Sequence, residues 1–130
     1  MRQTTAVILA ALMAAGAAQA EVAVEETAAK GVTVRLHLHP FLTVAEVTTL
    51  RLVATNADAR GLFIPQGKGF AALAVAPGEG FVRNSMPVES ATAIGGASDA
   101  VAAEAEARAE CDRKRKGGAA CVTVLEVAAP

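Results

Sequence analysis

The side chains best suited to chemistry are two histidines in the N-terminal half, in the stretch "VRLHLHP". His37 and His39 are two residues apart, and on a β-strand that spacing directs both imidazoles to one face, where they could share a transition-metal ion. A closed site needs further ligands, for which Glu46 and Asp58 are candidates. Arg35 falls on the same face and would repel a cation. We therefore interpret the pair first as a polar strand face and second as a metal site.

The cysteines lie near the C-terminus, in "ECDRKRKGGAACVTV". Cys111 and Cys121 are the only two in the chain, so their pairing is unambiguous if a disulfide forms. The spacing is not Cys-x-x-Cys, which favours a structural disulfide over a redox-active pair. The basic run at 113–116 is interpreted as the solvated end of a helix, whose cations complement the helix dipole. The alternative is that this basic run binds an anionic partner.

No other motif carries recognisable chemistry. Gly67-Lys68-Gly69 and Gly78-Glu79-Gly80 resemble pieces of phosphate loops, but neither completes such a pattern. No serine sits in a nucleophile elbow. The sequence therefore predicts no catalytic residue and no cofactor, and a small redox or hydrolytic enzyme is kept only as a second alternative.

The N-terminus predicts export. "MRQTTAVILAALMAAGAAQA" has a cation at Arg2, an apolar run and small residues before the junction of Ala20 and Glu21, as in a cleaved secretory signal peptide. The run is shorter than the roughly 20 residues of a membrane span, and no second long apolar run follows. We expect a periplasmic or secreted protein without a membrane span, in an oxidising compartment that favours the disulfide.

Composition narrows the class of partner. Removing residues 1–20, with one arginine, leaves 110 residues with 11 basic and 13 acidic side chains. That length fits one domain, at most with an arm, and the charge gives no reason to expect nucleic acid. Four Phe without Tyr or Trp offer few platforms for base stacking. The expected partner is an unidentified envelope protein or ligand, and the oligomeric state is left open.

Periodicity predicts the elements of the N-terminal half. Alternating apolar and polar residues indicate a half-buried strand over 32–38. A Thr-x-x-Glu capping box and apolar residues recurring every three positions indicate a helix over about 43–55. Residues 21–30 are interpreted as an arm or a short edge strand, and 56–61 as a loop.

The C-terminal half predicts a hairpin, a helix and a strand. A Gly-rich turn follows the apolar run 70–76, and the return strand is expected from Phe81, continuing or resuming as far as 94. A helix is expected over about 98–116, begun by Ser98. Periodicity alone does not choose between two faces of this helix, and a disulfide at Cys111 would favour the first, whose small residues could let the helix lie close to a sheet. The first face consists of Ala100, Ala103, Ala107 and Cys111, and the second of Val101, Ala105 and Ala109. The apolar stretch 121–127 is expected to be an interior strand.

Residues 70–127, above all "AEARAECDRKRKGGAACVTVLEV", resemble a family of small exported bacterial proteins built around a ββαβ domain of unknown function. The resemblance implies an α+β fold and a Cys111–Cys121 link, and it brings no established activity. Short proteins of this kind are sometimes labelled 5-aminolevulinate synthase. The sequence does not support that activity, which needs a large cofactor-binding fold with a lysine Schiff base.

Together these observations predict a signal peptide (1–20), an N-terminal strand and helix region (21–66) and a disulfide-linked ββαβ domain (67–130). The expected fold class is α+β, with a small antiparallel-rich sheet packed on one helix. The expected function is a non-catalytic interaction module of the cell envelope. Binding of a transition metal through His37 and His39 is the first alternative.

Overall fold

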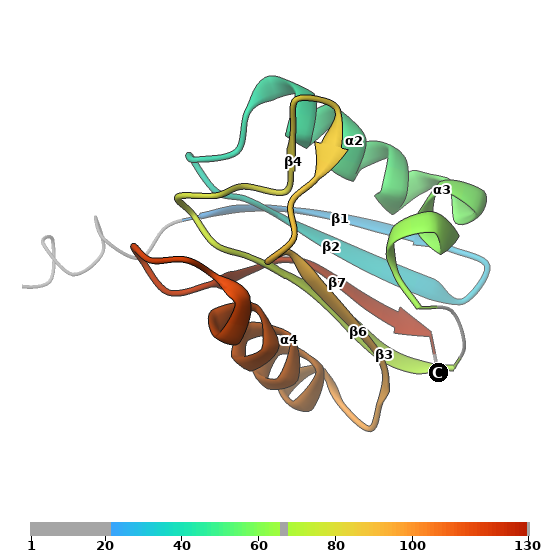
Figure 1. Ribbon diagram of the computed structural model, residues 1–130. Helices are drawn as coiled ribbons and strands as arrows, with labels where there is room; N and C mark the ends of the chain where they lie inside the picture. Colours follow the sequence, from blue (N-terminus) through green and yellow to red (C-terminus); the bar gives the residue numbers. More distant parts are fainter. Residues whose placement is uncertain (1–21, 66–67, 130) are drawn as a thin grey trace, which may run out of the picture.

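A five-stranded antiparallel sheet with helices on both faces forms the protein (Figure 1). The computed structural model describes residues 22–65 and 68–129, so the predicted signal peptide and its Ala20–Glu21 junction lie outside the described residues. The α+β fold class is confirmed. The elements are β1 (Ala23–Ala29), β2 (Val32–Leu38), α2 (Val44–Thr55), α3 (Ala57–Phe63), β3 (Gly69–Val75), β4 (Val82–Arg83), β5 (Met86–Pro87), β6 (Thr92–Ala97), α4 (Ala100–Lys114) and β7 (Val122–Ala129).

The last strand of the chain occupies the middle of the sheet, whose order is β1-β2-β7-β3-β6. Leu125 of β7 lies opposite Leu36 of β2 on one side and Leu73 of β3 on the other. The prediction of an interior strand at 121–127 is confirmed. Because β7 pairs with both β2 and β3, the N-terminal strands and the ββαβ unit belong to one sheet.

The first two strands form an edge hairpin. β2 has the predicted bounds, and β1 pairs with it along its whole length, so residues 23–29 form an edge strand. Lys30 and Gly31 both have positive φ, 54° and 80°. A two-residue turn with both central residues in this region matches the twist of the strands it joins, and glycine takes up that conformation without a steric cost.

Helix α2 covers one face of the sheet, on the side shown uppermost in Figure 1. Its predicted start is confirmed, because the Thr43 and Glu46 side chains form a reciprocal capping box. Leu50 and Val53 are fully buried within the larger core cluster, which also contains Leu36. None of the described helices is long and apolar enough to cross a membrane.

The loop expected over 56–61 is a helix instead. The Asn56 side chain accepts a hydrogen bond from the Ala59 backbone N–H at 2.9 Å and so begins α3 directly after it ends α2. Asparagine is among the strongest helix N-caps, and this property outweighed the turn signals of the sequence.

Helix α4 covers the opposite face through small residues, as predicted. Ala103, Ala107 and Cys111 are fully buried, and they share the second core cluster with Ala72 and Ala74 of β3. Alanine on both sides lets the helix lie close to the strand. The helix begins at Ala100 rather than at residue 98 or 99, because the capping side chain is that of Asp99 and not of Ser98: Asp99 Oδ1 accepts a hydrogen bond from Ala102 N at 2.8 Å.

The return strand of the β3 hairpin begins later than predicted. Residues 82–87 form a separate small hairpin, β4–β5, which turns at Asn84 and Ser85 with φ of 54° and 63°. The strand that pairs with β3 is β6, where Ile94 lies opposite Ala72. Two consecutive residues with positive φ reverse the chain, which explains why no continuous strand starts at Phe81.

A disulfide joins the end of α4 to the start of β7, as expected. Cys111 and Cys121 are both buried, with their Cα atoms 6.1 Å apart. Asp112 Oδ1 accepts a hydrogen bond from Cys121 N at 2.9 Å, and Glu79 accepts one from Lys116 N at 2.6 Å. The connection between α4 and β7 is therefore bonded both to the end of α4 and to the turn that follows β3.

Replacing both cysteines with serine should lower the free energy of unfolding by about 2–3 kcal/mol, because the disulfide restricts a loop in the unfolded chain. Urea unfolding of the C111S/C121S protein against the oxidised wild type measures the difference. The reduced wild type is the matched control and should resemble the double variant. Equal midpoints for oxidised and reduced protein would contradict a stabilising role.

Candidate functional site

The two histidines turn towards the last strand. The ring centroids of His37 and His39 are 6.3 Å apart, and His39 also stacks on Phe41 with centroids 5.4 Å apart. His37 Nε2 lies 2.5 Å from Glu126 Oε2, and His39 Nε2 donates to the Thr123 carbonyl oxygen at 2.9 Å. One nitrogen of each imidazole is therefore engaged by β7, and the bond to Thr123 places the His39 proton on Nε2.

A second carboxylate approaches from α4. Burial raises the pKa of Glu104, and the negative charge of Glu126 raises it further, while Arg108, with Nη1 at 3.6 Å from Glu104 Oε1, acts in the opposite direction. Beside them lies the buried Thr123, whose hydroxyl, like Arg108, lowers the pKa of Glu104. We call Glu104, Glu126 and His37 the carboxylate–histidine cluster. It joins α4, β7 and β2 on one face of the sheet.

In this cluster a carboxyl group whose pKa is raised by burial stands beside a second carboxylate that is hydrogen-bonded to an imidazole. A cavity of about 180 Å³ opens beside Glu126, and Arg35 lines it as well. Within residues 22–65 and 68–129, no three or more His, Cys, Asp or Glu side chains are grouped so that they could hold a metal ion. Metal binding by His37 and His39 stays a prediction.

The additional metal ligands considered from the sequence do not join the histidines. Glu46 lies on α2, which packs on the opposite face of the sheet, and Asp58 lies on α3. The carboxylates on the histidine side of the sheet are instead those of Glu126 and Glu104. No local pattern in the sequence indicated that either would lie there. Glu126 is 89 residues from His37, and only the pairing of β2 with β7 brings them together.

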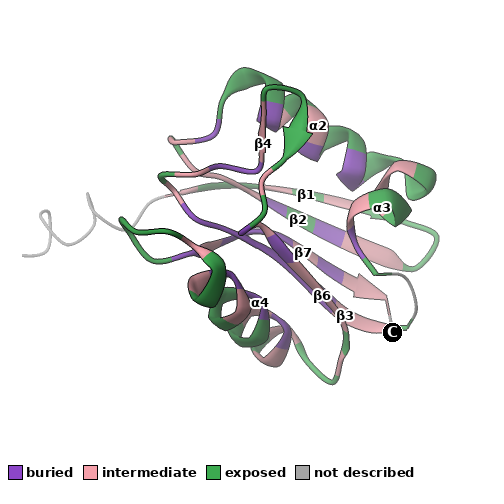
Figure 2. Cartoon of the chain, in the orientation of Figure 1, coloured by how far each residue is buried: buried purple, intermediate pink, exposed green. Residues whose placement is uncertain are grey.

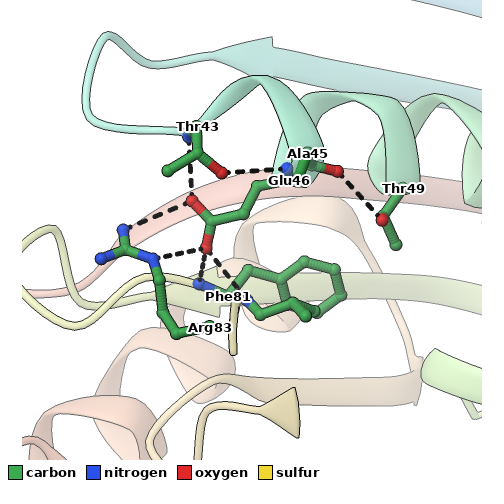
Figure 3. Close-up of polar contacts among 7 residues, drawn as sticks. Thr43, Ala45, Glu46, Thr49, Phe81 and Arg83 are labelled. Carbon is green, nitrogen blue, oxygen red and sulfur yellow. Dashed lines mark hydrogen bonds and ion pairs between the residues drawn. The ribbon is translucent and has the colours of Figure 1, made fainter. Parts of the chain in front are cut away.

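Among the described residues, Glu46 is the most deeply buried charged group, and its carboxylate is surrounded by donors (Figure 3). Its oxygens accept hydrogen bonds from the backbone N–H groups of Thr43, Phe81 and Val82, at 2.9, 2.5 and 2.9 Å. The Arg83 guanidinium adds two more, at 3.2 and 3.3 Å. The glutamate thus ties the start of α2 to the strand β4.

These contacts assign Glu46 a structural role. Burial by itself raises the pKa of Glu46, but the hydrogen bonds from Thr43, Arg83, Phe81 and Val82 outweigh it and lower the pKa to about 2. A carboxylate that is ionised at neutral pH and fully occupied by donors has no free lone pair with which to take up a substrate proton. The sequence predicted its capping contact with Thr43 but not its contacts with residues 81–83.

The basic run is partly paired within its own helix. Arg113 forms an ion pair with Glu110, and Arg115 forms one with Asp112 at 2.8 Å. Arg115 also donates to the Gly118 carbonyl oxygen at 2.7 Å. The arginines of this run therefore stabilise the end of α4 and the turn that follows it.

The outer face of α2 carries a stripe of exposed, uncharged side chains, and the exposed Arg51, which is paired with Glu25, lies beside this stripe. Val44 and Leu52 are 85 % and 53 % exposed, and Thr48 lies one helical turn from each, so the three form a stripe at i, i+4 and i+8. Figure 2 shows exposed residues along the side of α2 that faces away from the sheet. We call this stripe the α2 outer face. The helical spacing of these residues was visible in the sequence. The sequence did not show which apolar residues of the helix would face the sheet and which would face outwards.

The threonines of α2 make its surface less polar than their hydroxyls suggest. Thr48, Thr49 and Thr55 each donate to the backbone carbonyl four residues earlier, at 2.9, 3.0 and 2.8 Å. A hydroxyl that is bonded to its own helix is partly satisfied without water. Next to Val44 and Leu52, these side chains can be covered by a partner at a smaller desolvation cost than charged residues.

Comparisons with known proteins identify no relative: no family model matches the chain, and neither a curated protein nor a solved structure matches it significantly. The resemblance to exported ββαβ proteins therefore stays a prediction.

Replacing Glu46 with glutamine should lower the free energy of unfolding by roughly 3 kcal/mol at pH 7, the equivalent of lowering a pKa from 4.5 to about 2. Because the folded-state pKa is the lower one, this contribution is present above pH 4.5 and is lost as the pH falls towards 2. Urea unfolding at pH 7 and pH 3 measures it. Glu89→Gln, at an exposed position, is the control, and equal losses in both variants would contradict the anchoring role.

Glu104→Gln should instead stabilise the protein at pH 7, within about 1 kcal/mol. Burial and Glu126 raise the pKa of Glu104 above its usual 4.5, so the stability that its protonated form provides is complete below pH 4.5 and is lost as the pH rises through the folded-state pKa. Thermal unfolding between pH 4 and 8 should show the two proteins converging at the acid end. A variant less stable than wild type at pH 7 would contradict this assignment.

Proposed function

We propose that the protein is an exported, non-catalytic interaction module that binds another envelope protein through the α2 outer face. The observation that carries this proposal is the stripe of exposed, uncharged side chains on α2. A surface of this kind suits a partner with an uncharged, aliphatic patch, because neither side then buries an unpaired charge.

The state of the reactive groups supports a non-catalytic role. Both cysteines are bonded to each other, which leaves no free thiol in the described residues. Glu46 is occupied by donors, and one nitrogen of each histidine is bonded to β7. An intramolecular disulfide between buried cysteines fits folding in an oxidising compartment, and export by the predicted signal peptide would supply that compartment.

Photo-crosslinking in a bacterium that secretes the protein tests the proposal. A benzophenone amino acid at position 52 should give one adduct of discrete mass from the periplasm. The matched control is the same probe at Val101, which is 75 % exposed but lies on α4, on the other side of the sheet. The recovered protein should begin at Glu21 and be two hydrogens lighter than its reduced form.

A charge on the α2 outer face should remove the adduct. Val44→Glu suits this purpose, because an acidic residue in the first turn is favourable to the helix and leaves the fold intact. Equal crosslinking from positions 52 and 101, or an adduct that is unaffected by Val44→Glu, would reject the α2 outer face as the binding surface. A chain that keeps residues 1–20 would reject export.

A further inference from the structure

A cleft of about 250 Å³ separates the β1–β2 hairpin from the helices above it. Its floor comes from the hairpin and includes Val32 and Val34, and its wall comes from the end of α2 and the start of α3, at Ala54 and Ala57. A second cavity of about 210 Å³ adjoins it, since Val32, Ala57 and Arg60 line both. Together they reach the lower part of the range of small-molecule sites, roughly 300–1,000 Å³. We call the first cavity the hairpin cleft.

The charged side chains that line the hairpin cleft are both cations. Lys30 lies at the turn of the hairpin and Arg60 on α3, and no carboxylate is among the described residues that line either cavity. Across residues 22–65 and 68–129, neither cation forms an ion pair. The lining of the cleft is therefore positive, while the nearby Asp58 of α3 is exposed and lines neither cavity, in a chain whose formal net charge is −1.

The nearest acidic residues on the hairpin are paired with other arginines. Glu25 accepts two hydrogen bonds from Arg51, at 3.0 and 2.7 Å, and Glu26 lies 3.8 Å from Arg35. Arg60 is held in place by two bonds from Nη1 to the Val53 and Ala54 carbonyl oxygens, both at 3.1 Å. The guanidinium has further N–H donors on Nε and Nη2, so it can still bind an anion while it holds the end of α2.

We propose that the hairpin cleft binds a small amphiphilic anion, with an aliphatic body against Val32, Val34 and Ala54 and a carboxylate at Lys30 and Arg60. An apolar wall with convergent cations is complementary to this class of ligand and not to a cation or a sugar. The proposal does not depend on the α2 outer face, since none of Val44, Thr48 and Leu52 lines the cleft.

Titration of the ¹⁵N-labelled protein with sodium octanoate tests it by NMR. Octanoate should give saturable shifts at the amides of Ala29, Val32, Ala54 and Ala57. Octylammonium has the same aliphatic chain with the opposite charge, and it should bind at least about tenfold more weakly, since like charges would meet at the mouth of the cleft. Binding of octanol, which is uncharged, separates the contribution of the aliphatic chain to the affinity from that of the charge.

Lys30→Asn should weaken octanoate binding by up to about fivefold, as expected for one exposed ion pair. Asparagine tolerates the positive φ at this turn, so the hairpin is retained. Lys114→Asn, on α4 across the sheet, is the matched control and should not change the affinity. Equal binding of octanoate and octylammonium, shifts spread outside the cleft, or no saturation would overturn the proposal, whatever the outcome of the crosslinking experiment.

Discussion

The backbone ladder that β7 forms with β2 on one side and β3 on the other is the constraint on which the rest of the structure depends. A central strand has both edges paired, so its position decides which distant residues become neighbours. It joins the N-terminal hairpin to the ββαβ unit in one sheet. It also creates two core layers, a larger one under α2 built from leucine and valine, and a thin one under α4 built from alanine and cysteine.

Buried or half-buried carboxyl groups act on α2 and α4 in opposite directions. Glu46 is buried, ionised and surrounded by five donors, so it attaches α2 to β4 at neutral pH. On the opposite face, Glu104 and Glu126 place two carboxyl groups close together, which opposes folding once both are ionised. The covalent Cys111–Cys121 bond holds the far end of α4 against β7. It therefore limits how far this repulsion can separate the helix from the strand.

The same connections limit the chemistry that is available. The cysteines are joined, the histidines are bonded to β7, and Glu46 is occupied by backbone N–H groups. Besides the carboxylate–histidine cluster, the features that remain open are an uncharged stripe on α2 and an apolar cleft with two cations. These two surfaces are the basis on which we propose binding, to a protein at one and to a small anion at the other.

By itself the sequence determined the local structure wherever one short-range signal dominated. The alternation over 32–38, the Thr43–Glu46 capping box and the alanine stripe that ends at Cys111 each predicted an element that is observed. It failed where two local signals competed, as at Asn56, which begins a helix, and at Asn84 and Ser85, which delay the return strand. Only the tertiary structure decided that Glu126 meets both His37 and Glu104, that Glu46 receives further donors from residues 81–83, and that a cationic cleft forms beside the hairpin. These contacts join residues far apart in the chain, and their partners are set by strand order and helix placement, which no periodicity within one segment encodes.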